Sequence, residues 1–432
     1  MRLSVNHCAK IESADIMIDG ITVIAGANDT GKSTVGKILF SVFNAMNDID
    51  SKILDERRRE IYAGCRRHIN DFSDAGTARD LIYQRSDLVA RKIGSKVCAL
   101  SKEELTDKEI TEIVDEMLIR YFSKEVSSNP EYEDLVTKCV TSIKAIFDIP
   151  NETISREVLT RYFHNVFSGQ INSLYGKDKE SKVVVEIKGK KIELCFRENK
   201  CSDYEAQLSV MHKAIYIDNP FVLDSLESFT ELNIMDRFLR SWLTVDGERD
   251  VMEGIIESVM AKEKLEEINS VLGKVVAGNI TKDKADEYYL EDDSFQEPIA
   301  FNNLSTGLKA FVLIKMLLEK GILKNKDVLI LDEPEIHLHP EWQIAYAELI
   351  VLIQKYFDLS IVIATHSPYF VDAINLFSIK YGTDKNVNYY LTAMQESGVR
   401  MDRVTDDIER IYQKMASPIQ VLDTLRYELN NR

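Results

Sequence analysis

The sequence predicts an α/β fold interrupted by compact all-helical insertions, and three observations support this prediction. Apolar runs of strand length occur at residues 21–25, 328–331 and 361–364, and their apolar character is typical of buried strands. Helices with one apolar face follow the first run and separate the second run from the third. From about residue 47 to residue 182 the apolar spacing is helical instead.

The composition is that of a globular protein. A chain of 432 residues with 45% hydrophobic residues can form two or three domains with sizeable cores. No apolar run approaches the roughly 20 residues of a membrane span, and residues 2–11 are typical of a strand and not of a signal peptide. We therefore expect a cytoplasmic protein with no membrane partner. Six scattered cysteines without a CxxC pair indicate neither a disulfide framework nor a zinc site.

The net charge of −17 repels nucleic acid at long range, so DNA binding would need a local basic patch. Residues 57–59 and 66–68 offer one, because they comprise five arginines and a histidine. Asp55, Glu56 and Glu60 are interleaved with this patch, which favours a solvated helix face over a nucleic-acid footprint. DNA stays open as a partner.

Residues 26–33, Gly-Ala-Asn-Asp-Thr-Gly-Lys-Ser, match the phosphate-binding pattern GxxxxGK[ST] between a strand-type run and an amphipathic helix. Glycines let backbone N–H groups surround a phosphate at a helix N-terminus, and the lysine can reach the β- and γ-phosphates. The loop resembles a Walker A motif, in which the serine also binds Mg²⁺. The candidate nucleotide-binding residues are Gly26, Asn28, Asp29, Thr30, Gly31, Lys32, Ser33 and Thr34.

Residues 328–335, Val-Leu-Ile-Leu-Asp-Glu-Pro-Glu, predict a buried parallel strand that ends in two carboxylates and resembles Walker B. Asp332 would join Ser33 in holding Mg²⁺, and Glu333 would orient and polarise the attacking water. The next strand-type run ends in His366 and resembles the switch, or H-loop, whose imidazole can sense a γ-phosphate. The candidate catalytic residues are therefore Glu333 and His366.

A Leu-Ser-Thr-Gly stretch before an apolar helix resembles the ABC signature LSGGQ. Its Ser305 and Gly307 could bind the γ-phosphate of a nucleotide held by a second protomer, although Ser305 alone is also compatible with an ordinary N-cap. Glu335, His337 and His339 fall where ABC proteins carry the partner-facing D-loop. The two histidines could bind a metal, but no carboxylate or cysteine at ligand spacing completes such a site.

The order of these motifs resembles that of the ABC ATPase superfamily. The gap of about 270 residues between phosphate loop and signature resembles its RecF, SMC and OLD-like branch. Residues 331–340 and 364–368 look like those of OLD-type ATPases, several of which act in bacterial defence against phage. The resemblance implies an ABC-type P-loop ATPase head with a mixed sheet and flanking helices. It also implies ATP and Mg²⁺ as cofactors, and an even-numbered homo-oligomer built head to tail through composite ATP sites.

Head and insertions are expected to alternate along the chain. The expected order is 1–47 (head with Walker A), 48–182 (helical insertion), 183–222 (β part of the head), 223–283 (second helical insertion) and 284–432 (head with signature, Walker B and switch histidine). Helical apolar spacing at residues 251–260 marks the second insertion. OLD nucleases continue after the switch into a Toprim domain of about 100 residues. Only 66 residues follow His366, so we expect any nuclease to be a separate polypeptide.

These features predict a slow, regulatory ATPase that acts as sensor or scaffold in a bacterial anti-phage defence complex. It would dimerise through ATP and control a separate nuclease or toxin effector, similar to the ATPase subunits of two-gene systems such as Septu and PARIS. The alternative is a RecF/SMC-like ATPase of DNA repair or chromosome maintenance that acts directly on DNA. A transporter subunit is disfavoured, since transporter heads have a much shorter gap before the signature and a Q-loop glutamine that cannot be assigned here.

Overall fold

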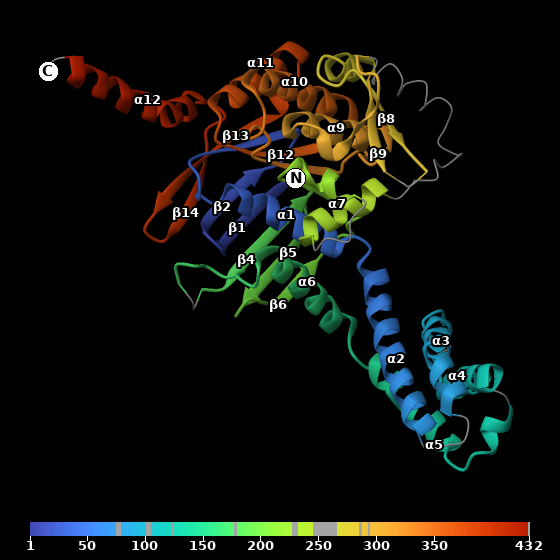
Figure 1. The fold of residues 1–432 in the computed structure, drawn as a ribbon. Coiled ribbons are helices and arrows are strands. Elements are labelled where there is room, and N and C mark those ends of the chain that lie inside the picture. The colour runs from blue at the N-terminus through green and yellow to red at the C-terminus, as the bar shows by residue number, and fades with distance from the viewer. Residues whose placement is uncertain are drawn as a thin grey trace. The chain divides into compact units, whose positions relative to one another are not determined.

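The chain folds into two compact units. The computed structural model describes residues 1–74, 79–100, 105–122, 124–176, 179–226, 232–244, 266–284, 287–292 and 294–430. One unit is Asp48–Val158, and the other joins Met1–Asn47 to Leu159–Arg432. The larger unit carries a mixed sheet with flanking helices, which confirms the predicted α/β class (Figure 1).

The described strands of the larger unit form one eleven-stranded sheet, ordered β6-β5-β4-β1-β2-β14-β13-β3-β12-β11-β7. The bounds are β1 Arg2–Cys8, β2 Ile11–Met17, β3 Ile21–Ala25, β4 Ser181–Ile187, β5 Lys190–Arg197, β6 Lys200–Ala206, β7 Ala214–Ile217, β11 Val328–Asp332, β12 Ser360–Thr365, β13 Val387–Gln395 and β14 Gly398–Arg403. Neighbours from β13 to β7 are parallel, whereas those from β6 to β2 are antiparallel. β14 joins the two halves, because it pairs in parallel with β2 and antiparallel with β13.

The parallel half of the sheet brings the sequence motifs to one edge. β3, β12, β11 and β7 lie side by side and run in the same direction, so their carboxyl ends meet there. The register pairs Ala25 with Thr365 and Ala364 with Asp332. The phosphate loop after β3, the acidic end of β11 and the histidine after β12 therefore lie at the same level.

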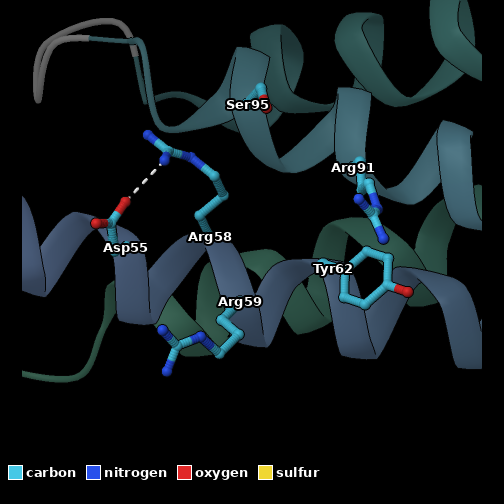
Figure 2. A pocket seen from close by; sticks show the side chains of 6 residues that line it. All are labelled: Asp55, Arg58, Arg59, Tyr62, Arg91 and Ser95. Atoms are coloured by element: carbon cyan, nitrogen blue, oxygen red, sulfur yellow. Dashed lines mark hydrogen bonds and ion pairs between the residues drawn. The ribbon is translucent and has the colours of Figure 1, made fainter. Parts of the chain in front are cut away.

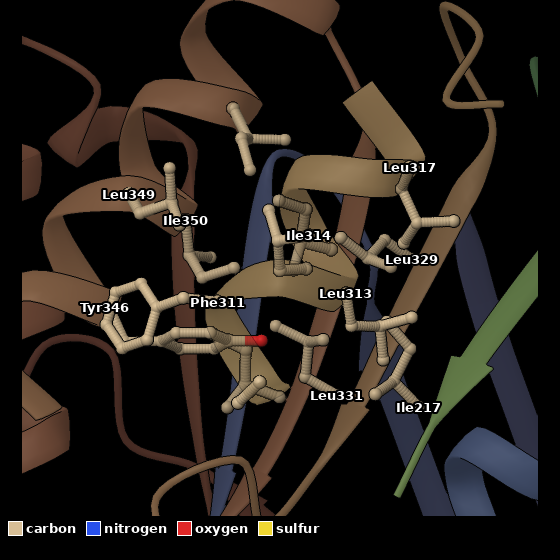
Figure 3. Close-up of a cluster of buried hydrophobic side chains, with 14 of the residues drawn as sticks. Ile217, Phe311, Leu313, Ile314, Leu317, Leu329, Leu331, Tyr346, Leu349 and Ile350 are labelled. Atoms are coloured by element: carbon tan, nitrogen blue, oxygen red, sulfur yellow. The ribbon is translucent and has the colours of Figure 1, made fainter. Parts of the chain in front are cut away.

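Helices bury both faces of the parallel half. Ile361 and Ile363 of β12 belong to one buried cluster and Val362 to another, which explains the unbroken apolar run of this strand. On one face, α9 (Thr306–Glu319) and α10 (Pro340–Phe357) pack against β11, and the rings of Phe311 and Tyr346 meet edge-on at 5.1 Å (Figure 3). On the other face, the buried residues of α1 (Lys32–Met46) complete the second cluster.

The larger unit has further helices, 3-10 turns and strands with named bounds. They are the end of α6 (Asn151–Phe167), α7 (Ile234–Thr244), α11 (Pro368–Tyr381), α12 (Glu409–Asn430), the 3-10 turns η2 (Pro220–Ser225), η3 (Phe301–Asn303) and η4 (Asp384–Asn386), and the strands β8 (Asn279–Lys282), β9 (Tyr288–Glu291) and β10 (Ile299–Ala300). The last three strands form a small antiparallel sheet.

The described part of the smaller unit is helical. It contains α2 (Ile49–Asp74), α3 (Arg79–Val97), α4 (Asp107–Phe122), η1 (Lys124–Ser128), α5 (Tyr132–Phe147) and the start of α6. Its core is a single cluster that includes Ile61, Val89, Val114, Cys139 and Ile143. The compact unit ends at Val158 within α6, whereas the sequence places the end of the insertion at residue 182.

The predicted domain boundaries stay predictions. The described end of the second expected insertion contains β8 in addition to helix, and the helical spacing at residues 251–260 lies outside the described residues. Within the head, β4 and β5 form an antiparallel hairpin in which Val185 pairs with Ile192.

Candidate nucleotide-binding site

The phosphate loop connects β3 to α1, and its conformation needs its glycines. Asp29 and Gly31 have φ angles of 65° and 73°, in the left-handed region where glycine is least strained. Gly26 packs against β13, because a Cβ on this residue would lie 1.8 Å from Thr392 Oγ1. The Thr392 hydroxyl donates to Thr30 Oγ1 at 2.8 Å. β13 thus braces the loop from the side.

Lys32 lies inside the loop and is 4% exposed. Its Nζ donates to the carbonyl oxygens of Gly26 at 3.1 Å and Ala27 at 2.8 Å. The same nitrogen lies 3.4 Å from Glu333 Oε1, at the end of the neighbouring motif. These contacts therefore hold the Lys32 ammonium group inside the phosphate loop.

The other loop residues divide by exposure. Asn28 and Asp29 are exposed, and Asp29 forms an ion pair with Lys10. Ser33 is half-buried and Thr34 is buried in the first turn of α1. Ser33 and Thr34 are therefore shielded from solvent, whereas Asn28 and Asp29 are open to it.

Asp332 accepts a hydrogen bond at each carboxylate oxygen. Ser33 Oγ donates to Oδ1 at 2.9 Å, and the hydroxyl of Tyr216, on neighbouring β7, donates to Oδ2 at 2.5 Å. Burial raises the pKa of Asp332, and these two donors oppose that rise. Burial and the Asp332 charge hold the pKa of Tyr216 well above its usual range. The structure thus brings together Ser33 and Asp332, the two predicted Mg²⁺ ligands.

A second carboxylate, that of Asp218, lies close enough to Asp332 to be affected by its charge, and a third, that of Asp236, lies close enough to be affected by Asp218. Burial raises the pKa of Asp218, which follows β7, and the negative charge of Asp332 adds to this rise. Burial raises the pKa of Asp236, on α7, to about 6, with a further contribution from Asp218. Lys37 of α1 lowers the pKa of both Asp218 and Asp332. This end of the sheet edge is therefore negatively charged. The sequence motifs do not single out Asp218 or Asp236.

Glu333 and His366 lie together beside the phosphate loop. Glu333 has a φ angle of 50°, and its backbone N–H donates to the Ala364 carbonyl at 2.8 Å. Its Oε1 lies 3.5 Å from His366 Nδ1 and 3.4 Å from Lys32 Nζ. The His366 side chain is 41% exposed. The two candidate catalytic residues therefore lie on the side of Lys32 that is open to solvent.

Glu335 points into the protein, although the sequence groups it with the partner-facing histidines. It is 3% exposed. Its Oε1 accepts hydrogen bonds from Thr365 Oγ1 at 2.5 Å and from the backbone N–H of His366 at 3.0 Å. Burial raises the pKa of Glu335, and the hydrogen bond from Thr365 opposes this. The turn after β11 folds this side chain towards the end of β12.

The signature residues lie in a separate hollow. Ser305 is the N-cap of α9, and its Oγ accepts a hydrogen bond from the Leu308 N–H at 3.4 Å. A Cβ on Gly307 would come within 3.0 Å of the His337 carbonyl and of the Trp342 ring. The open hollow measures about 480 Å³ and is lined by Ser305, Thr306, Gly307, His337, His339 and Trp342. In the described part of the chain, no group of three or more His, Cys, Asp or Glu side chains is arranged to hold a metal.

The residues at the sheet edge fit a nucleotide phosphate with Mg²⁺. A buried lysine beside a left-handed glycine turn at a helix N-terminus is a donor set for phosphate oxygens. Ser33 Oγ and Asp332 Oδ1, 2.9 Å apart, are the hard oxygen ligands that Mg²⁺ prefers. The roles assigned to individual residues stay predictions.

The arginine-rich face of α2 has acidic partners within the helical unit. Arg58 pairs with Asp55 at 2.7 Å and Arg59 with Glu56 at 2.8 Å. Arg57 is 5% exposed and therefore turns away from solvent. These pairs agree with a solvated helix face. An open hollow of about 370 Å³ on this face is lined by Asp55, Arg58, Arg59, Tyr62, Arg91 and Ser95 (Figure 2).

The parallel strands, the phosphate loop and the paired Ser33 and Asp332 define a P-loop ATPase. The chain belongs to the family described as AAA ATPase domain, which matches residues 9–371. In the described residues, no helix combines the length and apolar character that a membrane crossing requires.

Two curated relatives share part of the sequence. Elongation factor 3B of Saccharomyces cerevisiae is 34% identical over 120 residues, which cover 26% of this chain and 10% of that protein. Septu protein PtuA of Bacillus thuringiensis is 28% identical over 144 residues, which cover 29% of this chain and 36% of that protein. The chain thus spans about a tenth and about a third of these relatives. The family match shows an ATPase domain, and part of the chain resembles the Septu protein PtuA in sequence.

Among solved structures, SMC heads resemble this chain weakly. The SMC head bound to the C-winged helix domain of ScpA is 11% identical with a TM-score of 0.45, over 93% of this chain and 96% of that chain. The SMC head domain from Thermotoga maritima is 10% identical with a TM-score of 0.39, over 93% of this chain and 98% of that chain.

Proposed function

We propose that this protein binds ATP and Mg²⁺ between two copies of the chain and hydrolyses the ATP slowly. It would act as the nucleotide-controlled sensor and scaffold of a bacterial anti-phage defence complex. The observation that carries the proposal is the division of the site into two surfaces. Lys32, Glu333 and His366 lie together at the sheet edge, while Ser305 and Gly307 line a separate hollow. A nucleotide on the first surface would be completed by the signature of a second copy.

The geometry supports a distinct role for each residue at the sheet edge. Bound ATP would supply the γ-phosphoryl group, and its negative charge must be offset during transfer, in part by Mg²⁺. Lys32 offers positive charge, and Ser33 and Asp332 offer oxygen ligands. Glu333 Oε1 can accept a proton from the attacking water, and His366 can donate a hydrogen bond to a phosphate oxygen.

Exposed apolar side chains beside the signature hollow support pairing of two copies. Phe221 is 46% exposed, and its ring meets the His337 ring edge-on at 5.6 Å. Ile336, in the same turn as His337, is 52% exposed. Apolar side chains that lie together and stay exposed are typical of surfaces that a partner covers. A second copy seated over the hollow would bury them.

The defence role and the separate effector rest on similarity. The match to the Septu protein PtuA covers 29% of this chain and supports a scaffold that works with an effector protein, a nuclease or a toxin. The RecF/SMC-like alternative requires direct contact with DNA. The ion pairs of Arg58 and Arg59 leave less positive charge for phosphates than the sequence of α2 suggests.

Native purification of the tagged protein from its own host, with and without ATP, tests the proposal. The variant Lys32→Ala serves as the nucleotide-free comparison. A nuclease-like or toxin-like protein that stays bound in stoichiometric amount, and whose amount depends on ATP, would support the scaffold. A chain that purifies alone, with hydrolysis strongly stimulated by DNA and that stimulation lost at moderate salt, would favour the RecF-like function instead.

A further inference from the structure

Glu335 contacts the switch histidine from the protein interior. Its Oε1 accepts from the backbone N–H of His366 at 3.0 Å and lies 3.5 Å from the Nδ1 atom of the same residue. Thr365 Oγ1 donates to the same oxygen at 2.5 Å. One carboxylate oxygen therefore faces both the main chain and the ring of His366.

The burial of this carboxylate makes the contact unusual. The Glu335 side chain is 2% exposed, and within the described residues its Oε2 accepts no hydrogen bond. A buried carboxylate oxygen without a donor is costly, so proteins rarely keep one without a functional reason. A glutamine or an aliphatic residue would fill the space at lower cost if packing alone were needed. A glutamate at position 335 therefore indicates a role that uses its carboxylate as a hydrogen-bond acceptor.

The turn that carries Glu335 is itself fixed. Gln343 Nε2, on α10, donates to the Glu335 carbonyl at 3.4 Å and to the Leu338 carbonyl at 3.2 Å. Ser367 Oγ donates to Gln343 Oε1 at 3.0 Å. Gln343 thus links the turn after β11 to the residue that follows His366, so the acceptor and the histidine cannot shift independently.

The contact decides which ring nitrogen faces the site. His366 Nδ1 lies 3.5 Å from Oε1 of both Glu333 and Glu335, so this nitrogen is turned towards the two carboxylates. Nε2 is then the ring nitrogen left to meet a phosphate. Without Glu335, the loop after β12 would lose the acceptor that holds the main chain of His366.

We propose that Glu335 is the positioning residue of His366: it holds the backbone and ring of the histidine so that Nε2 is presented to the nucleotide. The inference rests on the ATPase function proposed above and assigns to this site a residue that acts through the switch. Glu335 does not touch the nucleotide in this scheme.

Three variants test the proposal. Glu335→Ala removes the acceptor, Glu335→Gln keeps an Oε1 that can accept from Thr365 and His366, and Glu341→Ala removes an exposed glutamate of α10 as a matched control. We expect Glu335→Ala to lower kcat for ATP hydrolysis by about 10- to 100-fold, because a small misplacement of a catalytic group has effects of this size. KM for ATP should stay within about 2-fold. Glu335→Gln should recover kcat to within about 3-fold of the wild type.

The second readout does not depend on hydrolysis. The chain has seven histidines, and the imidazole signal of His366 can be assigned in heteronuclear NMR spectra by its loss in His366→Gln. We expect this signal to shift in Glu335→Ala, to return towards its wild-type position in Glu335→Gln and to be unchanged in Glu341→Ala.

Each outcome decides the matter. An unchanged His366 signal in Glu335→Ala would overturn the proposal, as would a kcat equal to that of the wild type in this variant. A loss in Glu335→Gln as large as that in Glu335→Ala would also overturn it, because charge rather than hydrogen-bond acceptance would then be at work. If the wild-type protein does not hydrolyse ATP, the proposed function fails, but the NMR comparison still tests the contact.

Discussion

The hydroxyl of Tyr216 donates a 2.5 Å hydrogen bond to Oδ2 of Asp332 and so orients the carboxylate whose other oxygen faces Ser33. We expect Tyr216→Phe to raise the Mg²⁺ concentration needed for half-maximal ATP hydrolysis by about 10-fold, as losses of an orienting partner do. Mg²⁺ titration of hydrolysis measures this. Tyr346→Phe, an equally buried tyrosine on α10, is the control. An unchanged Mg²⁺ dependence in Tyr216→Phe would show that Asp332 needs no orienting partner.

The packing of Gly26 against β13 makes a second prediction. A Cβ on Gly26 would lie 1.8 Å from Thr392 Oγ1 and 3.1 Å from Thr392 Cβ. We expect Gly26→Ala to abolish binding of a fluorescent ATP analogue, because the loop must shift. The double variant with Thr392→Ala should recover part of the binding, since the hydroxyl is removed. Gly64→Ala is the control, as its nearest neighbour would be Ser142 Cβ at 3.8 Å. Full binding by Gly26→Ala alone would contradict the bracing role of β13.

Lys32 Nζ and Glu333 Oε1 lie 3.4 Å apart. Substitutions of these two residues should nevertheless impair different steps. We expect Lys32→Ala to lose ATP binding, because the main positive charge of the loop is removed. Glu333→Gln should bind ATP, lose hydrolysis by about 100-fold or more and accumulate as a dimer in ATP. Nucleotide titration, phosphate release and light scattering after gel filtration distinguish the two. Normal hydrolysis by Glu333→Gln would refute its catalytic assignment.

The signature hollow can be blocked without touching the phosphate loop. Ser305→Arg places a long side chain in the hollow that Gly307 and Trp342 line. We expect normal ATP binding, no ATP-dependent dimer and hydrolysis reduced by about 10-fold or more. Ser294→Arg, at an exposed serine between β9 and β10, is the control. Unchanged dimerisation and hydrolysis in Ser305→Arg would argue against a composite site.

The raised pKa of Asp236 predicts that the free energy of unfolding depends on pH. Burial raises its pKa to about 6 from the ordinary value of 3.8. Between these values the folded chain holds a proton that the unfolded chain has lost, so the free energy of unfolding falls as pH rises from about 4 to about 6. We expect Asp236→Asn to have a higher Tm than the wild type at pH 7 to 8 and a similar Tm near pH 4. Asp292→Asn, at a residue whose pKa is lowered by hydrogen bonds from Ser294, should not gain stability at neutral pH. Equal Tm values for Asp236→Asn and wild type across this range would contradict the shift.

The sequence locates Lys32, Asp332 and His366 because each follows an apolar strand-type run at a fixed offset. The contacts around them depend on strand order, which no local pattern specifies. Thr392 meets Thr30 across 362 residues because β13 lies beside β3. The hydrogen bond from Tyr216 to Asp332 exists only because β7 is the neighbour of β11.

Other elements escaped prediction for local reasons. β6, Lys200–Ala206, is an edge strand whose charged and polar residues conceal the two-residue alternation. β8, Asn279–Lys282, has only four residues and little apolar character. The sequence groups Glu335 with the partner-facing histidines, because its inward turn towards Thr365 is a tertiary contact that no local pattern indicates. Site residues are thus predictable where they belong to a sequence motif. They are not predictable where only the order of strands in the sheet brings them to the site.

The interleaving of strands has a consequence for how the chain acquires its structure. β2 and β3 are separated by only three residues in sequence, yet β14 and β13 lie between them in the sheet. The backbone N–H of Met17 donates to the hydroxyl of Tyr390, which arrives 373 residues later. During synthesis, the edge of β2 that pairs with β14 and the edge of β3 that pairs with β13 therefore stay unpaired until these later strands have been made. Assembly of the head is a late, long-range step of folding, and the phosphate loop is braced only when it is complete.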